Sequence, residues 1–181
     1  MAERQDAVET IYEQAKNNQW QQVLAAFIYD FLLAQKCSHY QKPSSGWTFL
    51  HQAAFFGHET ACRQLIRFGA HIDIQDNAKK SPCDIAKEHH HEHLAKLLEH
   101  AKFKKDSLWS PPSSSDLLAS SNLWNEASER KAVQQMNVAY GGASIAIPVG
   151  SRYFVDSFER ILVGWHGTYD PPCDMDANPQ V

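Results

Sequence analysis

The sequence has few cysteines, no long apolar run and no excess of basic charge. Its four cysteines, at positions 37, 62, 83 and 173, include no Cys-x-x-Cys pair, so a disulfide framework is not expected. The longest apolar run, residues 23–34, is interrupted by Asp30 and is shorter than the roughly 20 residues that cross a bilayer. A net charge of −4 provides no electrostatic signature of nucleic-acid or anionic-lipid binding.

The composition is that of an ordinary globular protein. Of 181 residues, 43% are hydrophobic and 21% are charged, which argues against wholesale disorder. This length suffices for one domain with a real core, or for a small array plus an appendage. The first 20 residues are polar and mixed in charge, with no pattern of a signal peptide. We therefore expect a cytoplasmic protein in a reducing environment.

Residues 46–58 carry the most informative pattern, which reads Gly-Trp-Thr-Phe-Leu-His-Gln-Ala-Ala-Phe-Phe-Gly-His. A related stretch begins 33 residues after Thr48: residues 81–86 read Ser-Pro-Cys-Asp-Ile-Ala, and His91 matches His58. This period is typical of stacked helix pairs. The first stretch resembles the core of an ankyrin repeat, G-x-T-P-L-H-x-A-A-x-x-G-H, with Phe49 in place of the proline.

The resemblance implies a mainly α-helical fold, a short ankyrin-repeat solenoid of two to three helix pairs. Thr48 and His51 match the family positions that hold the start of the inner helix. Gly57 would end that helix in a left-handed conformation, and an outer helix would span residues 59–68. In the next unit His90 takes the place of Gly57, and the outer helix would span residues 91–103.

Residues 4–17 and 20–35 are predicted to form two further helices, a degenerate first repeat. The second has a wide apolar stripe, which indicates burial on more than one side. This stripe consists of Trp20, Val23, Leu24, Phe27, Ile28, Phe31 and Leu32. The array would thus span residues 4–105, in units of residues 4–42, 43–76 and 77–105.

The remaining residues match no family that we identify. Residues 106–121 have the composition of a linker, which Trp109, Leu117 and Leu118 are expected to pin to the array. Residues 122–181 are expected to form a helix, over residues 123–136, and a three-stranded antiparallel β-meander. The three strands are predicted at residues 144–148, 152–157 and 161–165.

The positions between the fixed ones of an ankyrin repeat face the concave groove. The resemblance therefore implies a partner-binding surface made of Trp47, Gln52, Phe55, Phe56, Lys80, Ile85, Glu88 and His89. Exposed aromatic side chains are typical of interaction hot spots. We expect another protein as partner, without a cofactor, nucleic acid or membrane. Alternatively, the C-terminal segment of the same chain covers these rings.

A histidine cluster offers a metal-binding alternative. On one continuous helix His89 and His93 would be neighbours, with His100 near the same face, and such a face can hold a transition metal. The repeat pattern, however, places the turn between two helices at His90, so His89 and His93 would lie on different helices. We therefore expect a polar helix junction and no metal.

An enzyme is the alternative from another functional class, with the array as its targeting device. Residues 166–168, His-Gly-Thr, resemble the nicotinamide-binding strand of ADP-ribosyltransferases. Alternatively, His166 and Asp156 could activate Cys173 in a hydrolase-like site, where the histidine lowers the thiol pKa and the acid orients the ring. The sequence leaves both alternatives open beside the interaction module.

Overall fold

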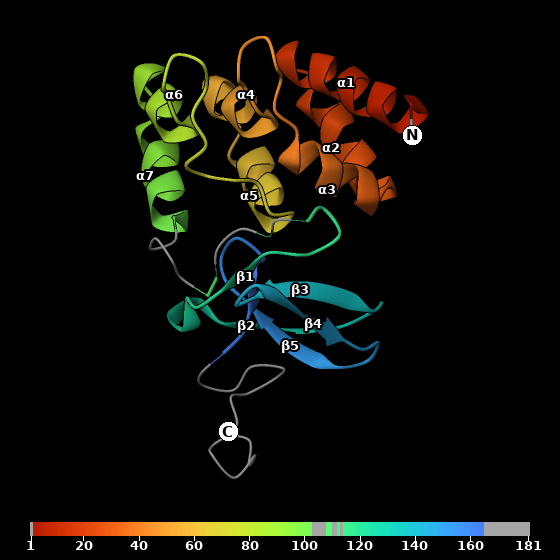
Figure 1. Ribbon diagram of the computed structural model, residues 1–181. Coiled ribbons are helices and arrows are strands. Elements are labelled where there is room, and N and C mark those ends of the chain that lie inside the picture. Colours follow the sequence, from red (N-terminus) through yellow and green to blue (C-terminus); the bar gives the residue numbers. More distant parts are fainter. Residues whose placement is uncertain (1, 103–107, 110–111, 113, 165–181) are drawn as a thin grey trace. The chain divides into compact units, whose positions relative to one another are not determined.

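A computed structural model describes residues 2–102, 108–109, 112 and 114–164. The chain divides into two compact units, Met1–Lys102 and Phe103–Val181. The described part of the first unit is helical, and that of the second forms short strands (Figure 1). The expected fold class, mainly helical with a small β region after the array, is confirmed.

The first unit consists of stacked layers of inner and outer helices. The inner helices α1, α4 and α6 pack in that order, and α3, α5 and α7 follow one another on the outer side (Figure 1). The helices are α1 (Ala2–Lys16), α2 (Trp20–Tyr29), α3 (Phe31–His39), α4 (Phe49–Phe56), α5 (Glu59–Arg67), α6 (Pro82–Glu88) and α7 (Glu92–Ala101). The helix positions predicted for the second and third layers agree with these bounds.

The layers share one apolar interior. Leu50, Leu65, Cys83 and Leu98, which come from four different helices, are all almost fully buried. Burial of each leucine side chain contributes about 1.5–3 kcal/mol to folding. Because no single helix pair could bury these side chains alone, the layers stabilise one another.

Local capping signals set the ends of α4. The Thr48 hydroxyl accepts a hydrogen bond from the His51 N–H, and the His51 ring accepts one from the Thr48 N–H, which forms a reciprocal cap. The helix ends at Gly57, whose φ of +71° lies in the left-handed region that favours glycine. Both features follow the sequence prediction.

Helix α6 begins with a similar reciprocal cap between Ser81 and Asp84, and Pro82 occupies its first turn. Hydrogen bonds from Ser81 lower the pKa of the Asp84 carboxyl. The turn after the helix passes through His90, whose φ of +61° matches the conformation of Gly57. Asp84 therefore supplies the cap for which α4 uses a histidine.

The helix predicted over residues 20–35 is interrupted at Asp30. This residue is extended, and its carboxylate accepts a hydrogen bond from the Leu33 N–H at 2.9 Å, which starts a new helix, α3. The expectation of burial on more than one side is wrong near the break. Ile28 and Leu32 are 84% and 49% exposed. The break changes the direction of the chain, so the stripe does not face the core along its whole length.

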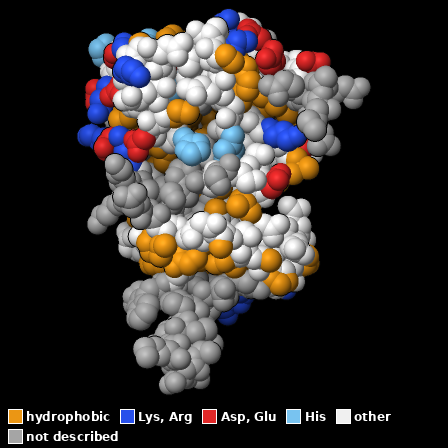
Figure 2. All heavy atoms as spheres, viewed as in Figure 1, with side chains coloured by type: hydrophobic (Ala, Val, Ile, Leu, Met, Phe, Trp, Pro, Cys, Tyr) orange, Lys and Arg blue, Asp and Glu red, His pale blue; other side chains and the backbone are white. Residues whose placement is uncertain are grey.

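The exposed residues beside the break differ from those on the last outer helix. Helix α2 contains no charged residue, and Tyr29 at its end is 91% exposed. By contrast, α7 exposes Glu92, Lys96 and Glu99, and acidic and basic side chains are mixed at the α6–α7 end of the array (Figure 2).

The described part of the second unit forms two small sheets in place of the predicted helix and meander. Its strands are β1 (Ser120–Ser121), β2 (Ser128–Lys131), β3 (Met136–Tyr140), β4 (Ala143–Ile147), β5 (Arg152–Val155) and β6 (Ile161–Leu162). One sheet has the order β1-β6-β5-β2, and the other consists of β3 and β4. Three strands lie near their predicted positions, but β4 pairs with β3 instead of β5.

The helix predicted over residues 123–136 is wrong. Only a 3₁₀ turn forms there, at Trp124–Glu126, and β2 and β3 follow. Strand β2 pairs antiparallel with β5 over four residues, from Ser128 opposite Val155 to Lys131 opposite Arg152. These partners lie more than 20 residues away along the chain, so a helical reading of the local pattern misses them.

The linker expectation is corrected at Trp109 and Leu118. The Trp109 indole donates a hydrogen bond to the Val163 carbonyl at 2.8 Å and packs against Tyr140. Leu118 is buried and forms a parallel β-bridge with Val138 of β3. Both residues are therefore built into the second unit, as are the residues of β1.

Candidate partner-binding surface

Trp47 is fixed at the entrance to α4 by a residue of the next hairpin. Its indole Nε1–H donates a 2.9 Å hydrogen bond to the Asp76 carboxylate. The ring stacks on His51, with centroids 5.8 Å apart and an angle of 28° between the planes. These two contacts hold the indole in one orientation. Trp47 is only part-buried, so part of its side chain remains open to solvent.

His51 is fully buried and joins two consecutive hairpins. Its Nδ1 accepts from the Thr48 N–H at 3.1 Å, so Nε2 carries the proton and donates to the Lys80 carbonyl at 3.0 Å. Burial lowers the pKa of His51, although the bond to Lys80 opposes this effect. The ring is therefore neutral and serves as a rigid support under Trp47.

The C-terminal end of α4 carries two further aromatic rings. Phe55 lies 5.8 Å from Trp47 and 4.9 Å from Phe56 between ring centroids, and its ring is nearly perpendicular to that of Phe56. The His89 ring, at the end of α6, lies 4.2 Å from the Phe55 ring. We refer to Trp47, Phe55, Phe56 and His89 as the aromatic strip. His89 is exposed, and the other three are part-exposed.

Lys80 and Glu88 form an ion pair next to the strip. The Lys80 ammonium lies 2.8 Å from the Glu88 carboxylate, whose hydrogen bond raises the pKa of Lys80. Both side chains are largely in water, so the pair adds little to stability. The two opposite charges of this pair offset each other next to the strip.

Two residues predicted for this surface lie in the interior instead. Gln52 is 7% exposed, and its amide donates a 3.0 Å hydrogen bond to the Tyr12 hydroxyl. Ile85 is 3% exposed on α6. Both residues hold variable positions of the repeat, which predicted exposure. The repeat pattern does not show which neighbouring helices cover a position, as Tyr12 of α1 covers Gln52.

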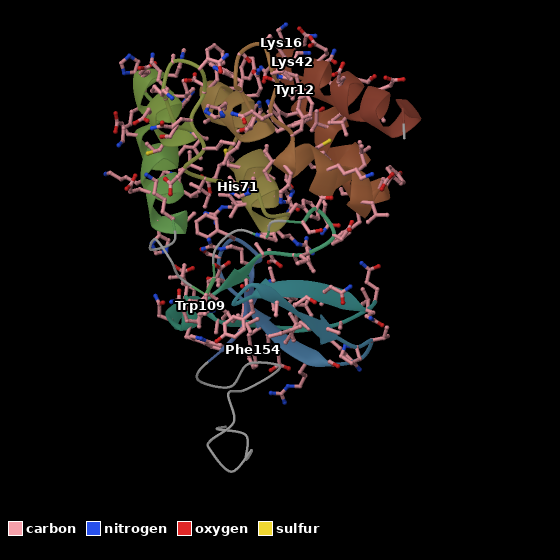
Figure 3. The ribbon with its side chains drawn as sticks, viewed as in Figure 1. Tyr12, Lys16, Lys42, His71, Trp109 and Phe154 are labelled. Atoms are coloured by element: carbon pink, nitrogen blue, oxygen red, sulfur yellow. The ribbon has the colours of Figure 1, made fainter. Side chains whose placement is uncertain are left out.

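Tyr12, whose hydroxyl accepts the hydrogen bond from Gln52, lies next to Lys42 (Figure 3). The Lys42 ammonium lies 5.6 Å from the centre of the Tyr12 ring and 3.5 Å from the Glu13 carboxylate. Through its bond to Gln52 and its ring contact with Phe49, the tyrosine connects the first layer to the second. The sequence analysis did not identify this role, because residue spacing gives no signal for it.

The metal alternative at His89, His93 and His100 is not supported. His89 follows α6, whereas His93 and His100 belong to α7, as the turn at His90 required. The His93 ring lies 3.2 Å from the Glu59 carboxylate on α5. Within the part of the chain that the structure describes, no three histidine, cysteine or carboxylate side chains are placed to share a metal ion.

Of the proposed catalytic residues, only Asp156 lies in the described part of the chain; His166 and Cys173 lie outside it. The Asp156 carboxylate is buried and accepts from the Phe158 N–H, the Arg160 N–H and the Arg160 Nε–H, at 2.8–3.0 Å. Both of its oxygens are thus engaged in closing the loop between β5 and β6. This geometry identifies Asp156 as a structural residue of that loop.

The helical unit can now be compared with known families. A family model of ankyrin repeats, in three copies, matches residues 6–107, more than half of the chain. The chain belongs to the ankyrin-repeat family. The three copies agree with the three layers of the ankyrin array, α1–α3, α4–α5 and α6–α7. Ankyrin repeats are generally protein-interaction modules.

The ankyrin array also contains a feature beside the aromatic strip that the sequence analysis missed, the carboxylate of Asp76. It accepts from the N–H groups of Ala78 and Lys80 at 2.8 and 2.9 Å, in addition to the Trp47 indole. An Asp at the start of a turn with this bonding is a recognisable local signal. Its bond to an aromatic side chain 29 residues earlier is not.

No described helix has the length and apolar character needed to span a lipid bilayer.

Proposed function

We propose that the ankyrin array binds another protein through the aromatic strip. The observation that carries this proposal is that ring surface stays open while the polar atoms around it are already bonded within the array. The Trp47 N–H bonds Asp76, the Lys80 carbonyl bonds His51, and the Phe55 carbonyl lies 3.1 Å from His91 Nε2. Exposed aromatic rings whose neighbouring polar atoms already have hydrogen-bond partners are characteristic of interaction hot spots.

Rigidity supports the same proposal. Trp47 is fixed by a hydrogen bond and by stacking on a buried ring, and Phe55 is held between Trp47, Phe56 and His89. Side chains ordered before binding lose little conformational entropy when a partner docks. The strip therefore offers preorganised apolar area.

The partner class and the cellular location are further parts of the proposal. A net charge of −4 favours a protein partner over nucleic acid or an anionic membrane surface. Cys37, Cys62 and Cys83 are free thiols in the core, which agrees with a cytoplasmic, reducing location.

A peptide-display selection on the full chain tests this function. Selected peptides are measured against Phe55→Ala and Phe56→Ala, with Tyr29→Ala as the matched control, because Tyr29 is an exposed aromatic residue outside the strip. We expect the strip variants to weaken binding by about tenfold or more and the control to have no effect. Equal affinity of all variants, with unchanged thermal unfolding, would refute the proposal.

A further inference from the structure

The carboxylate of Asp76 is a buried charge that is held by neutral donors. Burial by itself would raise the pKa of Asp76, but hydrogen bonds from the Lys80 N–H, the Ala78 N–H and the Trp47 indole together lower it. The carboxylate is therefore ionised at neutral pH, and its charge lies at the N–H edge of the indole.

The basic side chains near Asp76 offset this charge only in part, because Lys80 interacts with Glu88 as well as with Asp76. Lys80 is paired with Glu88 at 2.8 Å, and Lys42 lies 3.5 Å from Glu13. His51 is neutral, because its Nδ1 accepts a hydrogen bond. Lys79 is exposed at the hairpin tip, where water and salt screen its charge.

The hydrogen bond to Asp76 changes what Trp47 presents to a partner. A charge-assisted bond from the indole N–H to a carboxylate polarises the ring and increases the negative potential of its face. The face of an indole already attracts cations more strongly than that of other aromatic side chains. Because the N–H is occupied, Trp47 presents its π surface and no free donor.

We propose that the partner places an arginine side chain on Trp47, against the apolar edge formed by Phe55. This inference rests on the proposed function of the aromatic strip and names the chemistry of its partner. A guanidinium suits the site better than an ammonium, because it is planar, stacks on aromatic rings and is weakly hydrated. His51 stacks on one face of the indole, so the guanidinium would take the other face.

The peptides selected on the full chain provide the first test. We expect an arginine in those whose binding depends on the strip. Replacing it with citrulline, a neutral side chain of the same shape, should weaken binding roughly threefold to tenfold at low salt. If the selected peptides have only apolar anchors, or if citrulline binds equally well, this inference is wrong while the proposed function stands. If no strip-dependent peptide is found, both are wrong.

Two variants test whether Trp47 and Asp76 cause the preference for arginine over citrulline. Trp47→Phe keeps a ring but removes the N–H that bonds Asp76, and Asp76→Asn removes the charge with little change in size. Both should reduce the preference for arginine over citrulline, whereas Tyr29→Phe should leave it unchanged. Because Asp76→Asn perturbs the hairpin, its thermal unfolding is recorded in parallel, and Trp47→Phe alone is decisive. An unchanged preference in Trp47→Phe would overturn the inference.

Discussion

The ring of His91 occupies the space that a side chain at Gly57 would need. A Cβ atom built on Gly57 would lie 2.6 Å from His91 Cε1, well inside van der Waals contact. The same ring places its Nε2 3.1 Å from the Phe55 carbonyl. The turn that ends α4 therefore packs directly against His91, the residue that precedes α7 in the next repeat.

Gly57→Ala should destabilise the array by about 2–3 kcal/mol, because a left-handed backbone and a steric clash act together. The matched change is His90→Gly, at the equivalent turn, where a non-glycine residue has a φ of +61°. It should be neutral or stabilise by up to about 1 kcal/mol. Urea unfolding of the two variants checks both values, and equal effects would contradict the assignment.

Acidification from pH 7.5 to pH 5 should weaken the array through three of its histidines. Burial lowers the pKa values of His51, His58 and His71 in the folded protein. Below about pH 6.5, where free histidine gains its proton, the unfolded chain therefore binds more protons than the folded one. This contribution to stability is complete above pH 6.5 and is lost as the pH falls towards the lowered values.

The test measures the urea concentration at the midpoint of unfolding, at several pH values from 7.5 to 5. Asp76, Asp84 and Glu99, whose pKa values are lowered, remain ionised over this range. The midpoint should fall with pH, and His58→Asn should flatten the slope. A midpoint that rises on acidification would contradict the lowered pKa values of these three histidines.

The three described cysteines should react slowly in the folded protein. Burial, assisted by the charge of Asp30, raises the pKa of Cys37 to about 12, and burial also raises the pKa values of Cys62 and Cys83. Thiolate is the reactive form, so alkylation at pH 8 should be more than about a hundredfold slower than in urea. Mass spectrometry of a Cys173→Ser variant treated with iodoacetamide measures this directly, and rapid labelling would contradict the burial of these thiols.

Asp156→Ala should strongly destabilise the second unit. Its carboxylate bonds the buried Arg160 side chain and two backbone N–H groups of the loop between β5 and β6. Removing one partner of a buried ion pair typically costs about 3–5 kcal/mol. Hydrogen exchange of the β5 and β6 amides should accelerate accordingly. Asp156→Ala combined with Arg160→Met should recover part of the loss, and full protection in the single variant would argue against the structural role.

Local signals in the sequence explain why the helices of the second and third repeats were predicted closely. Thr48 and Ser81 each cap a helix start through a residue three positions later, and Gly57 ends its helix by its own backbone preference. These interactions lie within one turn of helix, so a linear pattern contains them. The assignment to the ankyrin family depended on the same residues.

The candidate surface was predicted only in part. The aromatic residues Trp47, Phe55 and Phe56 are part-exposed, as their repeat positions implied. Gln52 and Ile85 hold similar variable positions but are buried, because neighbouring helices cover them. Exposure depends on which elements pack above a position, and a repeat pattern does not contain that information.

The amino-acid order alone determined that helix pairs stack between Pro43 and Lys102, since short-range caps and a 33-residue period encode it. Three-dimensional packing decided the rest. It directed residues 128–131 into strand β2, because their partners in β5 lie more than 20 residues away along the chain. It also placed the Asp76 carboxylate within hydrogen-bond distance of the Trp47 indole, because a bond between side chains 29 residues apart forms only once two hairpins lie side by side.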